Sequence, residues 1–263
     1  MAFVPVPAPY SFERSTERFR AFGPDLANLW HEGGLRRVFD GREVRIEATP
    51  GGILVEPEAD VSWLLGLHWD IPAFTEFAAG DPVLAEVVRR VEGFRPPLQP
   101  DPFEALVTSI TAQQVSLFSA FAIRNRLIER FGERATHAYA FPTEERIAGG
   151  TEQELVELGF SGRKAEYVVA LARAGLDYPA LAALPDDEVK ARLTALRGLG
   201  EWTADWYLAR HLARPEAWPA GDLGVRKAVA AFYGEVDIRA VADRFAPFQN
   251  LTINYLLLAH RTP

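Results

Sequence analysis

A stiff, proline-rich segment divides this sequence into two stretches with different hydrophobic patterns. The segment is Arg95-Pro96-Pro97-Leu98-Gln99-Pro100, and prolines at this density favour an extended linker over a helix or a strand. Strand patterns come before it and helical patterns follow it. We therefore expect a mainly α protein, with a small N-terminal α+β domain over residues 1–99 and an all-helical domain over residues 100–263.

The N-terminal stretch contains the strand signals. Apolar and charged residues alternate over residues 43–48, and Asp40-Gly41 is a hairpin turn that joins this strand to residues 35–39. Residues 53–55 follow a proline-glycine turn and predict a third strand, whereas residues 81–91 predict a helix. A small sheet with flanking helices is therefore expected.

The second stretch is one helix after another. Residues 104–131 are apolar on several faces, which predicts one long helix ending at Gly132. Thr151 and Glu154 have the spacing of a capping box at the start of the next helix. Further helices are expected after Ser161-Gly162, after Pro185, over residues 201–212, and twice after Asp222.

Composition excludes several classes of protein and site. The 263 residues include no cysteine, which excludes disulfides, iron–sulfur clusters, thiolate zinc sites and cysteine nucleophiles. No secretory leader and no apolar run long enough to span a membrane occur, so we expect a cytoplasmic protein without a membrane partner. The net charge of −8 argues only weakly against nucleic acid, because backbone amides can also hold phosphates.

The common catalytic motifs are missing. The five histidines are scattered without metal-ligand spacing, so a zinc site is not expected. No nucleophile-elbow, Walker A or dinucleotide-binding pattern occurs, which leaves triad hydrolases and phosphate-loop enzymes without support.

A turn with two glycines, Leu196-Arg197-Gly198-Leu199-Gly200, joins two predicted helices. Glycine permits positive φ and a close approach of another backbone. The amides of Gly198, Gly200 and Trp202 would then point outward at a helix N-terminus, where anions bind. From the residues alone, a plain helical hairpin and a phosphate site both remain open.

Several motifs in the same order resemble one family. Residues 196–204, Leu-Arg-Gly-Leu-Gly-Glu-Trp-Thr-Ala, resemble the hairpin pattern L-P-G-[hydrophobic]-G-x-x-[T/V]-A of DNA-repair glycosylases, and Asp222 stands where those enzymes have their catalytic aspartate. Residues 100–107, 110–116 and 158–165 resemble further blocks of the same family. The chain is similar to the helix-hairpin-helix (HhH-GPD) superfamily, above all to the bacterial 3-methyladenine DNA glycosylase II (AlkA-type) branch.

The resemblance implies a role for Asp222 in bond cleavage. Its carboxylate would stabilise the oxocarbenium-like sugar formed as the glycosidic bond breaks, and would direct the attacking water. Position alone would instead make Asp222 the N-cap of the following helix. Asp205 is the nearby rival carboxylate.

The substrate pocket is expected to include Trp202, Trp206 and Leu257. Trp202 occupies the position of the Schiff-base lysine in bifunctional relatives, so we expect no lyase activity and water as the nucleophile. The indole faces would attract the positive charge of an alkylated base. Trp206 and Leu257 stand where the family has a tyrosine and a tryptophan, so the range of excised bases is left open.

The resemblance also implies contacts to DNA and to a cation. The expected DNA-binding residues are Gln113, Gln114, Arg197, Gly198, Gly200 and Thr203, with Gln114 filling the space left by the flipped nucleotide. The backbone carbonyls of Thr194, Leu196 and Leu199 match those that hold Na⁺ or K⁺ beside a phosphate.

The sequence therefore predicts a helix-hairpin-helix DNA glycosylase fold and a monofunctional enzyme of base excision repair. Such an enzyme flips alkylated bases out of double-stranded DNA and hydrolyses their N-glycosidic bond, with no required cofactor. We expect a monomer in the cytoplasm, associated with the nucleoid of a bacterium. Two alternatives are a helix-hairpin-helix protein that binds DNA or lesions without cutting, and a helical protein-interaction domain with a coincidental glycine turn.

Overall fold

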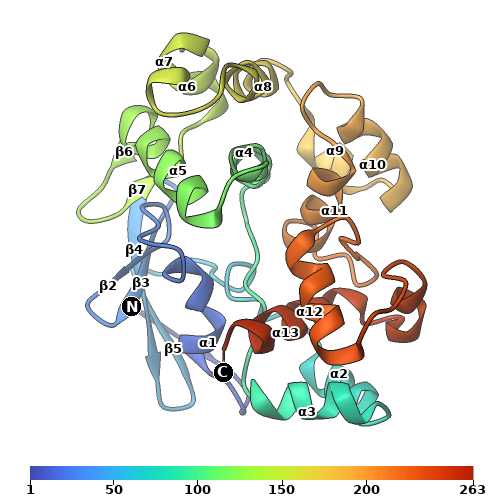
Figure 1. Cartoon of the computed structure of the whole chain (residues 1–263). Helices are drawn as coiled ribbons and strands as arrows, with labels where there is room; N and C mark the ends of the chain where they lie inside the picture. Colours follow the sequence, from blue (N-terminus) through green and yellow to red (C-terminus); the bar gives the residue numbers. More distant parts are fainter. Residues whose placement is uncertain (263) are drawn as a thin grey trace.

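The computed structural model describes residues 1–262, in which a small antiparallel sheet lies beside a larger group of helices (Figure 1). The five strands are β1 (Ala2–Pro5), β2 (Leu29–His31), β3 (Gly34–Phe39), β4 (Arg42–Thr49) and β5 (Gly52–Glu56), in the order β1-β5-β4-β3-β2. Asp40 and Gly41 both have positive φ, the backbone of a tight β3–β4 hairpin turn. The three predicted strands and their turn are confirmed.

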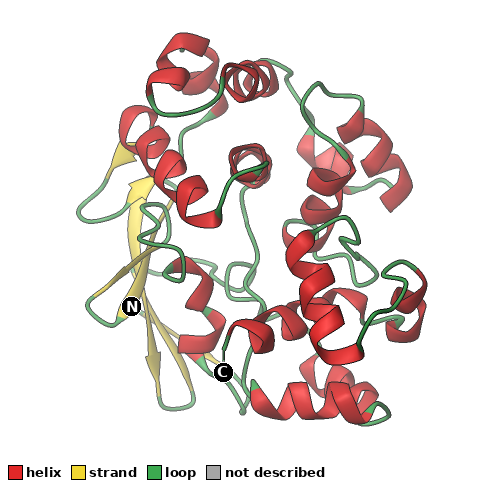
Figure 2. Ribbon diagram, viewed as in Figure 1, coloured by secondary structure: helices red, strands yellow, loops and turns green. Residues whose placement is uncertain are grey.

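Helices form most of the remaining chain (Figure 2). In the first part they are α1 (Phe12–Ser15), the 3₁₀ turn η1 (Glu17–Phe19), α2 (Ile71–Ala78) and α3 (Pro82–Arg90). They continue as α4 (Pro102–Ala112), α5 (Leu117–Phe131), α6 (Glu144–Ala148), α7 (Glu152–Glu157), α8 (Gly162–Ala172), α9 (Tyr178–Ala182) and α10 (Asp186–Thr194). The last are α11 (Glu201–Arg210), α12 (Leu223–Tyr233), the 3₁₀ turn η2 (Ala240–Phe245) and α13 (Gln249–Arg261). The short strands β6 (Glu133–Arg134) and β7 (Tyr139–Ala140) pair between α5 and α6.

No helix within residues 1–262 is long and apolar enough to cross a membrane.

The predicted single helix over residues 104–131 is wrong. The chain forms α4 and α5 instead, and residues 113–116 turn between them. Gln114 has φ +54, a conformation that no α-helix contains, and Ser116 caps α5 by accepting a hydrogen bond from the Ser119 amide. The apolar pattern continues across the break because Val115 on the turn and Leu117 at the start of α5 are exposed instead of buried in the core.

Other predicted helix ends agree with the structure. Thr151 and Glu154 form both hydrogen bonds of the capping box that starts α7, and Ser161 caps α8. Helix α5 ends at Gly132 as predicted, although Gly132 is extended and not left-handed. Glycine is needed there because a Cβ atom would lie 2.5 Å from the carbonyl oxygens of Ala140 and Ile128.

The hydrophobic core forms two clusters that do not divide at the proline-rich segment. The smaller cluster runs from Val6 to Leu65 and covers the sheet, whereas the larger one begins at Trp69 and includes the helices of the rest of the chain. Helix α3 packs against α13. The clusters thus separate well before the domain boundary predicted after residue 99, because residues 69–98 pack with the helical part.

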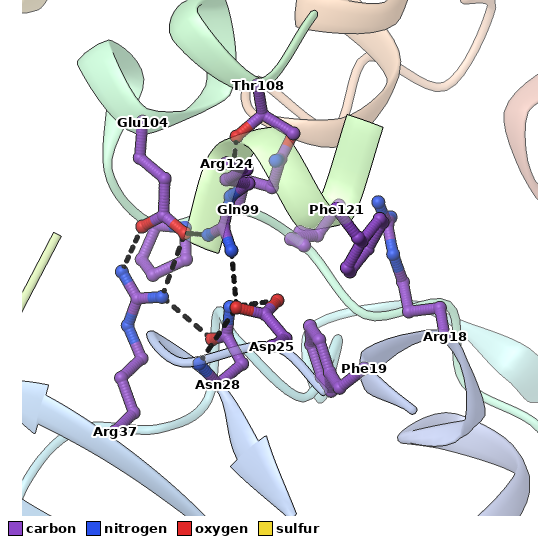
Figure 3. A pocket seen from close by; sticks show the side chains of 12 residues that line it. Arg18, Phe19, Asp25, Asn28, Arg37, Gln99, Glu104, Thr108, Phe121 and Arg124 are labelled. Atoms are coloured by element: carbon purple, nitrogen blue, oxygen red, sulfur yellow. Dashed lines mark hydrogen bonds and ion pairs between the residues drawn. The ribbon is translucent and has the colours of Figure 1, made fainter. Parts of the chain in front are cut away.

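A buried ionic network joins the sheet to the helices (Figure 3). Glu104 of α4 accepts hydrogen bonds from Arg37 of β3, at 2.6 Å, and from Arg124 of α5. Arg124 also pairs with Asp25, whose carboxylate holds the Asn28 side chain at 3.0 Å. Burial alone would raise the pKa of Glu104, but the charges of Arg37 and Arg124 lower it to about 2. This network fixes the sheet against the α4–α5 pair that borders the site described next.

Candidate active site

The turn between α10 and α11 uses its two glycines for different purposes. Gly198 has φ +89, and a Cβ atom there would lie 2.2 Å from Cγ of Tyr167 on α8, so the turn and its packing both require glycine. Gly200 is extended, with φ −102, and no heavy atom lies within 4 Å of its virtual Cβ. Positive φ, which glycine permits at either position, therefore occurs only at Gly198. Gly200 leaves the backbone at the start of α11 open to a partner.

The start of α11 has unsatisfied backbone donors. Gly200 is its N-cap and forms no side-chain capping bond, so the amides of the first turn have no partner from a capping side chain. The Thr203 hydroxyl is buried and unpartnered, so a contact from Thr203 to DNA would come from its backbone. The Arg197 side chain is exposed beside this turn, where it pairs with Glu166 of α8.

The α4–α5 turn is attached to the α10–α11 turn by one side chain. Gln113 donates a hydrogen bond from Nε2 to the Gly198 carbonyl at 2.9 Å. Gln113 therefore positions the two turns relative to each other, whereas the neighbouring Gln114 is exposed and left-handed at the tip. Only Gln114 of this pair has its side chain free to enter a duplex.

Asp222 is held by three donors. It caps α12, because Oδ1 accepts a hydrogen bond from the Val225 amide at 3.0 Å. Its other oxygen, Oδ2, accepts hydrogen bonds from Nε1 of Trp202 at 2.7 Å and from Nε1 of Trp206 at 3.1 Å. The capping interpretation and the functional one are thus compatible, since the cap uses one oxygen and the two indoles orient the other.

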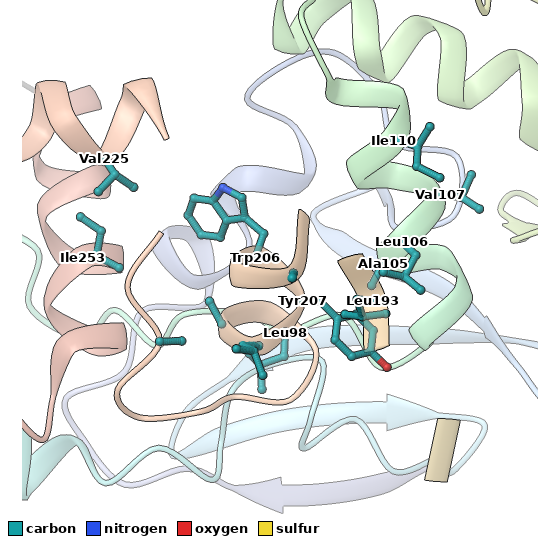
Figure 4. Packing of buried hydrophobic residues seen from close by; sticks show 14 of the residues in the cluster. Leu98, Ala105, Leu106, Val107, Ile110, Leu193, Trp206, Tyr207, Val225 and Ile253 are labelled. Carbon is teal, nitrogen blue, oxygen red and sulfur yellow. The ribbon is translucent and has the colours of Figure 1, made fainter. Parts of the chain in front are cut away.

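The three predicted pocket residues lie around this carboxylate. Trp206 is buried on α11 (Figure 4). The Arg210 guanidinium lies 3.6 Å from the centre of its ring. Trp202 is half-buried one turn earlier. Leu257 of α13 is half-buried beside them, while its neighbours Leu256 and Leu258 are buried in the core. The expectation that both indoles present free faces needs revision, because Arg210 covers one face of Trp206.

These residues line a cleft of about 980 Å³. Its walls come from the α4–α5 turn, from α11 to α13, and from the segment after α1. The predicted site residues in its lining are Gln113, Gln114, Gly200, Trp202, Thr203, Trp206, Asp222 and Leu257. Arg197, Gly198 and the three predicted cation ligands lie outside it.

Asp205, the rival carboxylate, is not part of this cleft. It is buried on the opposite side of α11, where it pairs with Lys190 of α10 at 2.8 Å. Burial raises the pKa of Asp205, against the lowering effect of Lys190. Its role in the described structure is to hold α10 against α11.

Comparison with known proteins agrees with this geometry. The family model of the HhH-GPD superfamily of base excision DNA repair proteins matches residues 107–242. The chain belongs to this family. The match includes the α4–α5 turn, the α10–α11 turn and Asp222, so the predicted family and fold class are confirmed.

Named relatives of this HhH-GPD protein are similar over different lengths. It is 32% identical over 164 residues to a DNA-3-methyladenine glycosylase of Bacillus subtilis, which is 59% of this chain and 54% of that protein. It is 31% identical over 279 residues to a probable bifunctional transcriptional activator/DNA repair enzyme AlkA of Mycobacterium tuberculosis, covering 96% of this chain and 55% of that protein. The chain spans about half the length of the curated relatives it matches.

One solved structure is similar over its whole length. A 3-methyladenine DNA glycosylase from Archaeoglobus fulgidus superimposes with a TM-score of 0.89 at 29% identity. The superposition covers 100% of this chain and 99% of the other, so the N-terminal sheet is included.

The predicted cation site of this HhH-GPD protein has suitable donors. Thr194 is the last residue of α10, so its carbonyl lies at a helix end, where partners are lacking. The Leu196 carbonyl accepts a hydrogen bond from the Leu199 amide at 3.1 Å and keeps one lone pair. Carbonyl oxygens of this kind suit a hard monovalent cation, and its binding stays a prediction.

The basic side chains of the cleft belong to none of the sequence motifs. Arg18, Arg210 and Arg261 all line it. Arg210 could have been found, since it lies four residues after Trp206 on the same face of one helix. Arg18 had no such signal, because it follows α1 in the N-terminal part and reaches the cleft only through the tertiary fold.

Proposed function

We propose that this protein is a monofunctional DNA glycosylase that excises alkylated bases from double-stranded DNA in base excision repair. The observation that carries the proposal is the three-donor setting of Asp222 inside the cleft. Its relatives named as 3-methyladenine glycosylases support the choice of substrate class. The cytoplasm, in association with the nucleoid, is the proposed location because chromosomal DNA is the substrate.

The donors around Asp222 suit an oxocarbenium-like transition state. Two indole N–H groups and one amide are neutral, so they orient the carboxylate and leave its negative charge in place. A fixed negative charge in a poorly hydrated cleft stabilises positive charge that develops on the sugar. Oδ1 has one protein donor and therefore keeps an acceptor site for the attacking water.

The mouth of the cleft suits a duplex opened at one base. Gln114 lies on one lip together with the exposed apolar side chain of Leu117, and Leu223 is 63% exposed on the other lip. We propose that Gln114 enters the space left by the flipped nucleotide, and that the apolar lips pack against the unstacked neighbours. The amides at the start of α11 would hold phosphates on the 3′ side of the lesion.

The same geometry argues for hydrolysis without strand cleavage. Trp202 fills the place of the imine-forming lysine and donates to Asp222, so no amine stands beside the carboxylate on α11. Lys227 of α12 lines the cleft and is the amine to test. We propose a monomer that needs no cofactor, with the monovalent cation at the α10–α11 turn as a structural aid to phosphate binding.

A binding protein without catalysis is the weaker alternative. Binding alone would not require a carboxylate held by two indoles at the centre of the cleft. The relatives named as glycosylases also favour the enzyme.

Release of labelled bases from methylated duplex DNA tests the proposal. Asp222→Asn keeps the cap of α12, because asparagine is as good an N-cap as aspartate. It removes the charge and the second acceptor oxygen, to which the two indoles donate. We expect base release to fall about 10²–10³-fold, the usual loss for one electrostatic stabiliser, with duplex binding largely kept. The strand should stay intact until alkali is added, and borohydride should trap no covalent adduct.

Asp70→Asn is the matched control. Asp70 caps α2 in the same way, through the Ala73 amide at 3.0 Å, and lies outside the cleft. Near-native base release by Asp222→Asn would overturn the assignment. An adduct that disappears in Lys227→Gln would show lyase chemistry and overturn the monofunctional part.

A further inference from the structure

The cleft has an excess of positive charge. Five of its lining side chains are arginine or lysine, and Asp222 is its single carboxylate within residues 1–262. Two of the five are paired elsewhere: Arg124 with Asp25 and Glu104, and Arg261 with Glu17. The remaining cations are Arg18, Arg210 and Lys227.

Arg210 lies close enough to Asp222 for the two charges to interact. Its guanidinium lies 3.6 Å from the Trp206 ring centre, and the edge of the same ring donates to Asp222. Its Nε is buried without a hydrogen-bond partner, and neither Arg210 nor Arg18 forms a side-chain hydrogen bond or ion pair with another residue of the described part. Burying charged donors in this way costs stability unless a ligand satisfies them.

The surroundings of the two arginines work against their charge. Burial and the charge of Arg18 lower the pKa of Arg210 well below its usual value. Burial and the charge of Arg261 lower the pKa of Arg18 to about 10. Both guanidinium groups still carry their protons at neutral pH, so the free protein keeps repelling cations together in one wall of the cleft.

The position of Arg210 suits contact with the flipped base and not with the phosphates. Arg210 ends α11, whereas the open amides proposed to bind phosphate lie at the opposite end, around Gly200. The Arg210 carbonyl accepts a hydrogen bond from the Gln99 amide at 2.8 Å, on the segment that joins the two parts of the chain. Arg210 therefore lies in the interior of the cleft, beside the aromatic ring.

On the basis of the proposed function, we propose that Arg210, assisted by Arg18, makes the cleft favour, among the damaged bases that it excises, neutral bases with a carbonyl or ring-nitrogen acceptor over cationic ones. A guanidinium donates two parallel hydrogen bonds to such an edge. It repels a base that is itself positively charged, such as a ring-methylated purine. One face of the Trp206 ring, which was predicted to attract a cationic base, is already covered by the Arg210 guanidinium.

Base release and duplex binding, measured together on two substrates, test this inference. The substrates are matched duplexes with one hypoxanthine, which is neutral and has a carbonyl acceptor, or one 7-methylguanine, which is cationic. Release is expressed relative to the uncatalysed loss of each base, because a cationic base leaves more easily by itself. We expect wild type to accelerate release of hypoxanthine more than release of 7-methylguanine.

Arg210→Met removes the charge and the donors but keeps contact with Trp206. It should lower hypoxanthine release about tenfold, and leave unchanged or raise that of 7-methylguanine, so the ratio of the two moves. Arg18→Met should move the ratio in the same direction by a smaller factor, because the cation stacked on Trp206 is Arg210. Arg130→Met is the control, because Arg130 is exposed on α5 and pairs with Glu154 outside the cleft.

Four results would overturn the inference. If Arg210→Met lowers the release of both bases equally, Arg210 only holds Trp206 in place. Weaker binding to every duplex, with a shallower salt dependence, would make Arg210 a phosphate contact. Release of 7-methylguanine alone by wild type would exclude selection for neutral bases. Release of neither base by wild type would refute the proposed function. In that case duplex binding still tests the inference, and equal affinity for the two damaged duplexes would overturn it.

Discussion

Glu104 and Asp222 are carboxylates held by opposite means. Glu104 is 1% exposed and is held by two arginines. Asp222 is held by two indole N–H groups and an amide, although Arg210 lies against one of the same indoles. In one site the charges cancel, and in the other only neutral groups touch the carboxylate.

The difference separates a structural carboxylate from one that is free to act on a charged partner. Paired with arginine, Glu104 links β3, α4 and α5 and has no charge left for a ligand. Neutral donors fix the direction of the Asp222 oxygens and leave the charge available for a cationic transition state. The arginines of the cleft are then free to contact another group, which is the basis of the selectivity proposed above.

The largest effect on stability is expected from Glu104→Gln. The substitution leaves Arg37 buried without its anion and Arg124 with Asp25 alone, so we expect a loss of about 3–5 kcal/mol in the free energy of unfolding. Chemical denaturation at neutral pH measures it. Glu133→Gln is the control, because the pair of Glu133 with Arg146 is exposed and should contribute less than about 1 kcal/mol.

The pH dependence sharpens this result. Because the pKa of Glu104 is lowered to about 2 in the folded protein, its contribution is complete above its ordinary value near 4.5 and disappears as the pH falls toward 2. The difference between wild type and Glu104→Gln should shrink over that interval. A difference below about 1 kcal/mol at neutral pH would show that the two carboxylates are not distinguished by pairing.

A smaller effect, on activity, is expected from Trp202→Phe. Phenylalanine keeps most of the ring but removes the 2.7 Å hydrogen bond to Oδ2, leaving that oxygen with the Trp206 donor alone. A hydrogen bond to a charged group contributes about 1.5–3 kcal/mol, so base release should fall at least about tenfold. Single-turnover release measures it at saturating enzyme.

Trp218→Phe provides the matched comparison for Trp202. Trp218 also donates through Nε1, to the Ile238 carbonyl at 2.8 Å, but it is absent from the cleft lining. It should lower stability and leave base release per folded molecule near the wild-type value. Equal losses in the two variants would mean that orientation of Asp222 by neutral donors is unimportant.

The parts predictable from the sequence are those encoded by neighbouring residues. The β3–β4 hairpin, the capping box and the α10–α11 turn each depend on a few consecutive residues, and all three are present. The break after α4 was hidden because the apolar pattern continues through Val115 and Leu117. Periodicity cannot tell an apolar residue buried in a core from one exposed on a turn.

Contacts between distant segments could not be predicted in this way. The spacing of Trp202 and Trp206 placed both on one face of α11, but the direction of their N–H groups depends on how α12 brings Asp222 to them. Arg18 reaches the cleft from the segment after α1. Such arrangements depend on tertiary packing, which short runs of neighbouring residues do not determine.

The smallest effect is expected at the other place where this protein is proposed to hold an anion with neutral donors, the start of α11. Valine fits at Gly200 without strain, because the backbone is extended and nothing lies within 4 Å of the virtual Cβ. In Gly200→Val the added side chain would keep a phosphate away from the first-turn amides, so duplex affinity should fall about tenfold, the equivalent of one such hydrogen bond. The loss should be equal for damaged and undamaged duplexes, because phosphate contacts do not read bases. Gly80→Val, at an exposed glycine between α2 and α3, is the control. If Gly200→Val folds and binds DNA as wild type does, the α10–α11 turn is only a structural connection. Asp222 would then be the one anion of the proposed mechanism that neutral donors hold.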